Sequence, residues 1–196
     1  MGRIKEEELM NLLERMKRAF STMSSWKPEE IKQTLLNLDV SLEEVTAFLR
    51  DPAGKPYARK VLYQDDHVEV IVMNWSALAC APHDHGQSAG WIQVLSGRTK
   101  QTIYRVENDS LPEPLFTETQ NKGSCFFAPV RGVHQMAQEG GEPLITLHLY
   151  SPPIRGMKVY DLEACAACIV STDCGAWWPD DQKQKVKEIQ LKKKRT

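Results

Sequence analysis

Residues 82–91, PHDHGQSAGW, contain the pattern around which the rest of the chain is interpreted, two histidines separated by one residue. Successive side chains of a β-strand point to opposite faces, so His83 and His85 are predicted to share one face of a strand. Imidazole nitrogens bind zinc, copper, iron and nickel, so the pair needs only a third ligand to hold a metal ion. The pair alone is a weak signal, because a His-x-His is more often a surface feature. The rest of the chain has to supply the third ligand and a substrate pocket.

The composition is typical of a single soluble domain. The chain has 196 residues, of which 41% are hydrophobic and 26% charged, and its formal net charge is −1. This length allows one continuous core with flanking elements. The small net charge gives no reason to expect nucleic acid or a membrane surface as a partner. There is no apolar signal segment and no run near the roughly 20 residues of a membrane span. Five scattered cysteines argue against a disulfide framework. We therefore expect a cytoplasmic protein, monomeric or weakly homo-oligomeric.

Hydrophobic periodicity predicts helices in residues 1–50. Leucines recur at spacings of three and four within residues 3–20, as in an amphipathic helix. Pro28 opens a second helix, and Ser41 with Glu44 forms the capping box of a third. Residues 51–56, DPAGKP, end the helical part.

After this point the pattern changes to short strands separated by turn signals. The predicted strands are residues 58–63, 68–75, 91–95, 99–106, 116–118, 124–128 and 144–150. Short strands at this spacing favour a sandwich or barrel over βαβ units. The predicted fold class is mainly β, with a barrel over residues 57–153 and an N-terminal segment of about three helices.

The C-terminal part is expected to complete this single domain without strands of its own. Residues 154–182 are predicted to pack on the barrel and to include a short helix at 161–169. The lysine-rich tail, residues 183–196, is expected to be a solvated, frayed terminus, rather than a nuclear-localisation or nucleic-acid-binding segment.

A third ligand is predicted at His134, which follows a glycine turn, a strand and a proline turn in residues 123–134. With His83 and His85 it resembles the two-motif layout of the cupin superfamily, a double-sheet jelly roll with a metal ion inside the barrel. Cupins usually carry a glutamate in the first motif. Here Gly97 closes that motif, which places Gly90 in the glutamate position. The predicted centre therefore has three neutral imidazoles and no carboxylate, which favours a chelating, anionic substrate.

A second polar group is predicted on the strand at 144–150, where Thr146, His148 and Tyr150 share one face. A hydroxyl, an imidazole and a phenol in line can form a hydrogen-bonded chain that orients the phenol. A lone histidine would more often be a satisfied core residue. The aligned hydroxyl and phenol favour a functional role.

These motifs together resemble the cysteine dioxygenase family, and more closely its bacterial thiol dioxygenases. The resemblance rests on the His-Asp-His at residues 83–85, on His134 and on residues 147–153, LHLYSPP, and it spans about residues 57–153. It implies that Fe(2+) is held by three ligands, His83, His85 and His134. It also implies a catalytic relay of Thr146, His148 and Tyr150, with threonine in place of the family's serine, and a substrate site formed by Tyr57, Arg59 and Tyr150.

The resemblance implies that O2 oxidises the thiol of L-cysteine to cysteine sulfinate, a step of L-cysteine catabolism toward sulfinate and taurine metabolism. Arg59 would hold the substrate carboxylate bidentately. Related enzymes for 3-mercaptopropionate carry a glutamine at this place, so Arg59 favours cysteine. Mammalian enzymes have a cysteine in the position of Gly90, joined by a thioether to the tyrosine that matches Tyr150. The phenol of Tyr150 is therefore expected to be free.

Three alternatives stay open. The chain could oxidise another small thiol such as 3-mercaptopropionate. It could be a non-catalytic ligand-binding cupin, which would have no use for the relay. A zinc site at Cys165, Cys168 and Cys174 is a third possibility, but its fourth ligand is not evident. His67 stands in a turn and is expected to be exposed.

Overall fold

The structure is a computed structural model that describes residues 2–108 and 110–192, with side chains described from residue 11 onward. Within these ranges three helices come first, α1 (Gly2–Ser21), α2 (Pro28–Asn37) and α3 (Leu42–Thr46). The strands that follow are β1 (Tyr57–Gln64), β2 (Glu69–Trp75), β3 (Ala89–Ser96), β4 (Arg98–Arg105), β5 (Glu113–Asn121), β6 (Cys125–Ala128), β7 (Val133–Gln138), β8 (Ile145–Ser151), β9 (Lys158–Asp161), β10 (Ala166–Val170) and β11 (Lys185–Gln190). None of the described helices is long and apolar enough to span a membrane.

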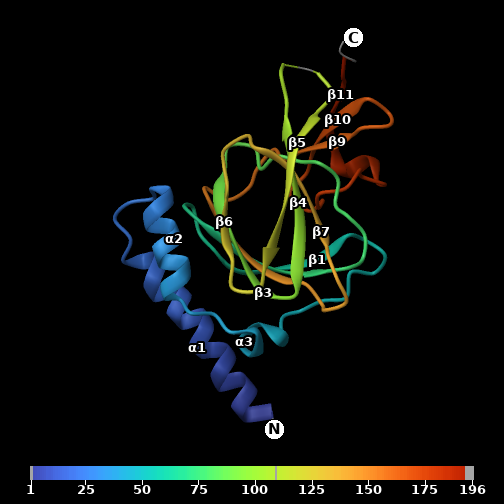
Figure 1. The fold of residues 1–196 in the computed structure, drawn as a ribbon. Helices are drawn as coiled ribbons and strands as arrows, with labels where there is room; N and C mark the ends of the chain where they lie inside the picture. Colours follow the sequence, from blue (N-terminus) through green and yellow to red (C-terminus); the bar gives the residue numbers. More distant parts are fainter. Residues whose placement is uncertain (1, 109, 193–196) are drawn as a thin grey trace.

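The strands form the two layers of a jelly-roll barrel. One layer is a five-stranded sheet in the order β1-β2-β8-β3-β6. The other consists of two three-stranded sheets, β5-β4-β7 and β11-β10-β9. His83 joins these two sheets, because it forms bridges with His134 of β7 and with Val159 of β9. The prediction of a mainly β barrel preceded by helices is confirmed (Figure 1).

The inner strand β2 of the five-stranded sheet is buried on both faces because each face packs against a different partner. On β2, Ile71 and Met73 point into the barrel core, whereas Val70 and Val72 belong to a second core under the helices. The helices cover that outer face with Leu12, Met16, Phe20, Ile31 and Leu35, all nearly inaccessible to solvent. This arrangement explains why β2 lacks the polar alternation of a half-solvated strand.

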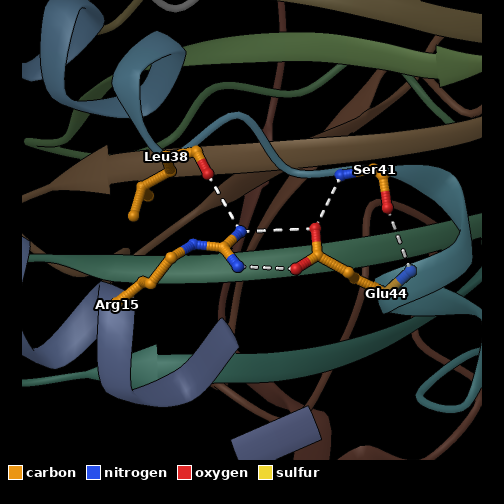
Figure 2. A network of polar contacts seen from close by, with 4 residues as sticks. All are labelled: Arg15, Leu38, Ser41 and Glu44. Carbon is orange, nitrogen blue, oxygen red and sulfur yellow. Dashed lines mark hydrogen bonds and ion pairs between the residues drawn. The ribbon is translucent and has the colours of Figure 1, made fainter. Parts of the chain in front are cut away.

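A polar network ties the helices together (Figure 2). Glu44 and Ser41 form the predicted capping box, with the Glu44 N–H 3.3 Å from Ser41 Oγ and the Ser41 N–H 3.0 Å from Glu44 Oε2. The guanidinium of Arg15 donates to Glu44 Oε1 at 2.6 Å and to the Leu38 carbonyl at 3.0 Å. Arg15 therefore links α1 to both later helices, and its guanidinium lowers the pKa of the Glu44 carboxyl.

Some predicted boundaries are wrong. The segment 83–85 is not a regular strand, because His83 makes only single bridges to its two neighbours. β5 begins at Glu113, within the predicted loop, and β7 was not predicted.

The predicted helix at 161–169 is also wrong, because this segment contains the turn between β9 and β10. The Asp161 carboxylate accepts the N–H groups of Glu163 and Ala164, which stabilises a reversal of the chain.

The prediction that residues 183–196 form a solvated, frayed terminus is wrong in one respect, because residues 185–190 are an ordered strand, although most of its side chains are exposed. Residues 185–190 form β11, which pairs antiparallel with β10. Leu191 follows at 7% exposure, in a small core with Val133, Tyr160 and Ala167. The sequence of β11 hides this strand, because its alternation does not separate apolar from charged side chains: Val186 is 66% exposed, whereas the ammonium group of Lys185 lies over the ring of Trp178. Residues 193–196 lie outside the described residues.

Candidate metal centre and active site

The structure brings His83, His85 and His134 together inside the barrel. One ligand atom from each lies within 4.8 Å of the others, and this is the one group of that kind among the residues that the structure describes. The three side chains are 2 to 6% exposed. His134 comes from β7, and the reciprocal backbone bonds between His83 and His134, at 2.9 and 3.0 Å, hold these two rings at the same level.

Backbone and side-chain acceptors determine the tautomer of two of these rings. His83 Nδ1 lies 2.9 Å from the Ala81 carbonyl, and His134 Nδ1 lies 2.8 Å from Gln101 Oε1. Both oxygens can only accept, so both Nδ1 atoms carry the proton and both Nε2 atoms keep a lone pair. His134 Nε2 and His85 Nδ1 are buried without a hydrogen-bond partner in the described structure. Unpartnered buried nitrogens of this kind fit a metal ligand.

The electrostatics of the cluster keep the imidazoles neutral. Burial lowers the pKa of His83 to about 4. Burial and the neighbouring imidazoles hold the pKa of His85 and His134 well below the usual value. Metal ions bind the neutral form of histidine, so the three rings meet the condition for a first-row transition metal.

A hydrogen-bonded chain runs along β8 to the cluster. Thr146 Oγ1 lies 2.7 Å from His148 Nε2, His148 Nδ1 lies 3.0 Å from the Tyr150 hydroxyl, and that hydroxyl lies 3.1 Å from His85 Nε2. The three β8 side chains are at most 2% exposed. The strand places them on one inward face, as the sequence pattern predicts.

Trp75 gives this chain a direction. Its indole N–H donates to Thr146 Oγ1 at 2.8 Å, so the threonine hydroxyl is free to donate its own hydrogen to His148 Nε2. Burial lowers the pKa of His148 to about 3, so the ring is neutral. Its single N–H then lies on Nδ1 and donates to Tyr150, which leaves the phenol O–H free to donate on the side of the cluster, where His85 Nε2 lies 3.1 Å away. The reverse direction would leave the threonine hydrogen without a partner.

Gly90 makes room for the Tyr150 ring. The two residues are paired across β3 and β8. A Cβ atom at position 90 would lie 2.4 Å from Tyr150 Cδ1 and 2.4 Å from the Leu149 carbonyl oxygen. The absence of a side chain therefore sets the position of the phenol as well as removing a possible ligand.

The predicted substrate residues lie on β1, at the edge of the pocket. Arg59 is half-buried and donates to the carbonyl of Thr172. The hydroxyl of Tyr57 accepts the N–H of Ala176 at 2.7 Å. Both side chains line a small inner pocket together with the three histidines and Tyr150. Residues beyond β10 therefore anchor both of them, which the sequence pattern did not indicate.

The inner pocket, about 20 Å³ in volume, adjoins a larger cavity of about 620 Å³. Four residues line both spaces, namely Arg59, Ile71, Ile154 and Met157. Glu69 lines only the larger one and is 7% exposed, with its Oε1 accepting the Ile154 N–H at 2.6 Å. Arg59 thus stands where the larger cavity meets the inner pocket.

The other candidate residues lie apart from this centre. Within the described chain, Cys165, Cys168 and Cys174 do not gather into a group that could hold a metal ion. Their thiols instead lie near backbone carbonyls of Leu162, Ile169 and Trp177. His67 is exposed, as expected, and stacks on the ring of Trp26.

Sequence reasoning missed Trp75 and Gln101, and gave Asp84 no role. Asp84 is 7% exposed, and its Oδ1 accepts the N–H groups of Gly86 and Lys158 at 2.9 and 3.0 Å. The hydrogen bond from Lys158, the first residue of β9, connects the His-x-His segment to that strand. The only available signal for Trp75 and Gln101 was their inward register on predicted strands.

Comparison with known proteins finds a matching family model and several similar proteins. The family model of cysteine dioxygenase type I matches residues 43–163. Cysteine dioxygenase type 1 of Danio rerio is 21% identical over 165 residues, covering 81% of each chain. The protein of the same name from Rattus norvegicus is 24% identical over 143 residues, covering 63% of this chain and 71% of the relative. A solved Klebsiella pneumoniae protein with a double-stranded β-helix domain is 19% identical, covers 57% of this chain and 84% of its own, and has a TM-score of 0.46.

Proposed function

Because the chain belongs to the cysteine dioxygenase type I family, we propose that it oxidises the thiol of L-cysteine with O2 to cysteine sulfinate at a mononuclear Fe(2+). The three-histidine cluster supports a metal-dependent thiol dioxygenase. The observation that carries the proposal is the Trp75-Thr146-His148-Tyr150 chain, because it ends in a phenol beside the cluster. A barrel that only bound a small ligand would not need a directed hydrogen-bond chain.

We assign His83, His85 and His134 as the iron ligands. When bound there, iron would hold the thiol and O2 at one site and relay electrons from the sulfur to O2. The reaction is balanced without a further reductant, since both oxygen atoms of O2 end on one sulfur and the thiol becomes a sulfinic acid.

We assign Arg59 to the substrate carboxylate. The guanidinium has five N–H donors, and its bond to the Thr172 carbonyl uses only part of them. The remaining donors can form a bidentate pair with a carboxylate at the entrance of the inner pocket. Tyr57, whose hydroxyl is held by Ala176, supports the same wall.

We assign Tyr150 as the proton donor to the reacting atoms. Its hydroxyl already accepts from His148, so its own hydrogen points toward the pocket. Burial holds the pKa of the phenol well above its ordinary value, so the group remains a donor at physiological pH. His148 and Thr146 position it.

The five cysteines are free thiols, which fits a reducing cytoplasm. There the sulfinate product would enter L-cysteine catabolism and sulfinate or taurine metabolism.

The test is oxygen uptake by protein loaded anaerobically with Fe(2+), with L-cysteine, 3-mercaptopropionate or cysteamine as substrate and mass spectrometry of the product. We expect one O2 consumed per cysteine sulfinate formed. The variant Arg59→Gln should lower kcat/KM for L-cysteine about 10- to 100-fold, since a hydrogen bond to a charged group contributes about 1.5–3 kcal/mol. Lys60→Gln, an exposed neighbour on β1, serves as the control.

A preference for cysteamine, which lacks the carboxylate, would contradict the role of Arg59. A preference for 3-mercaptopropionate would support the proposed thiol dioxygenation but contradict L-cysteine as the substrate. Metal binding without oxygen uptake on any thiol would support the non-catalytic alternative.

A further inference from the structure

A second polar chain reaches the metal cluster from the opposite layer of the barrel. Glu118, Gln101 and His134 lie on three adjacent strands of the sheet β5-β4-β7. Gln101 is directly opposite Glu118 in the register of β4 and β5. Gln101 Nε2 donates to Glu118 Oε1 at 3.0 Å, and Gln101 Oε1 accepts from His134 Nδ1 at 2.8 Å. The chain therefore connects a half-buried carboxylate at the rim to a buried ring in the core.

The orientation of the Gln101 amide matters because its two ends have opposite hydrogen-bonding character. An amide oxygen facing His134 requires a proton on Nδ1 and leaves Nε2 with a lone pair. An amide NH2 facing the ring would require a lone pair on Nδ1 and the proton on Nε2. In that state His134 Nε2, which is buried without a hydrogen-bond partner in the described structure, would carry a proton and could not bind a metal ion.

Glu118 selects between these two orientations. A carboxylate can only accept, so it pairs with the NH2 end of Gln101 and turns the amide oxygen toward His134. Gln101 is 3% exposed, so water does not offer an alternative partner. Among the described residues, Gln101 is the one side chain that forms a hydrogen bond with His134.

We propose that Glu118 is a remote positioning residue of the metal centre, which acts through Gln101 to fix the metal-binding tautomer of His134. The inference rests on the proposed metal centre but concerns residues to which the proposed function gives no part. It makes the β4–β5 hairpin a determinant of metal affinity, although Glu118 itself does not touch the metal pocket.

The test uses the full-length protein in four variants. Glu118→Ala removes the selecting acceptor, and Gln101→Met removes the amide at similar size. The double variant Gln101→Glu with Glu118→Gln keeps an acceptor opposite His134 Nδ1. The carboxylate at position 101 accepts from His134 and from the amide at position 118. Glu113→Ala removes a carboxylate from the same strand, one that pairs with Arg105 instead, and serves as the control.

Two measurements are made on each variant. Long-range proton–nitrogen NMR of metal-free, ¹⁵N-histidine-labelled protein reports which ring nitrogen of His134 carries the proton. Competition titration with Zn²⁺, and anaerobically with Fe²⁺, reports metal affinity. Thermal unfolding verifies that each variant is folded.

We expect the wild type, the double variant and Glu113→Ala to show only the Nδ1–H tautomer. Glu118→Ala and Gln101→Met should show an Nε2–H population and bind metal about 10- to 100-fold more weakly, the usual effect of losing such a partner. A pure Nδ1–H tautomer and unchanged affinity in both variants would overturn the proposal. A tautomer shift in a protein whose wild type binds no metal would support the Glu118 role and reject the metal centre itself.

Discussion

Acidification of the metal-free protein should destabilise it strongly, because four neutral histidines are buried in the barrel. His83, His85, His134 and His148 are at most 6% exposed. Burial lowers the pKa of His83 to about 4 and that of His148 to about 3, and it shifts the other two in the same direction. In the unfolded chain the same groups titrate near the ordinary value of about 6.5.

Proton linkage determines the direction in which the stability of the protein changes with pH. Between the native and unfolded pKa values the unfolded state binds more protons than the native state, so stability rises with pH. The contribution of these histidines is therefore complete above about pH 6.5 and is lost as the pH falls below that value. At about pH 5.5 each histidine costs about 1.4 kcal/mol relative to neutral pH, and the four together about 5–6 kcal/mol. This is comparable to the whole stability of an ordinary domain, about 5–15 kcal/mol.

Urea denaturation with a chelator present, at about pH 7.5 and 5.5, measures this difference. The variant His148→Gln should be less stable than the wild type at the higher pH, because Thr146 and Tyr150 lose their partner. Its loss of stability on acidification should nevertheless be smaller by about 1.4 kcal/mol, since one buried imidazole is gone.

The comparison of variants cancels an opposing contribution. Burial raises the pKa of Asp84 and Glu69, and such carboxyls favour the native state as the pH falls. They are present in the wild type and in the His148→Gln variant, so they do not affect the difference between the two proteins. If His148→Gln and the wild type lost equal stability on acidification, His148 would not be a buried neutral group, and the direction assigned to the Tyr150 relay would be refuted.

Three substitutions test the contacts around the pocket. Trp75→Phe removes the donor to Thr146 and should lower kcat about 10-fold in oxygen uptake, with KM little changed, because one hydrogen bond of about 1–1.5 kcal/mol orients the relay; an unchanged kcat would contradict this. Gly90→Ala places a Cβ against the Tyr150 ring and should lower the free energy of unfolding by about 1–3 kcal/mol, whereas wild-type stability would mean that the ring moves freely. Asp84→Ala leaves two backbone N–H groups without an acceptor and should lower the free energy of unfolding by about 1–3 kcal/mol in urea denaturation. Asp84→Asn keeps an acceptor and should lose less stability. Equal losses in the two variants would argue against this contact.

The sequence was most informative where a pattern is local. Pro28 and the Ser41–Glu44 pair predict the starts of two helices correctly, because capping depends on residues within one turn. The inward face of β8 follows from alternation alone, since Thr146 and Tyr150 differ by an even number of positions. These features needed no knowledge of the partner strands.

Partners chosen by strand pairing could not be predicted in the same way. Trp75 and Thr146 are separated by 71 residues, and Gln101 and His134 by 33. Which tryptophan or glutamine meets which hydroxyl or imidazole depends on the order of strands in each sheet, which the chain order does not reveal. The C-terminal error has the same cause, because β11 is a strand only by virtue of its pairing with β10.

The C-terminal strands belong to the active site, although no residue of β9, β10 or β11 is assigned to the chemistry. The backbone of His83 forms hydrogen bonds with His134 on one side and a bridge with Val159 of β9 on the other. The same segment therefore joins the two three-stranded sheets and brings two proposed metal ligands together. Past β10, the carbonyl of Thr172 holds Arg59 and the N–H of Ala176 holds Tyr57. Backbone groups make these contacts, so side-chain identity there is weakly constrained while the path of the chain is strictly constrained. A motif of side chains could therefore indicate the chemistry of this pocket, but only the fold shows what holds the pocket in shape.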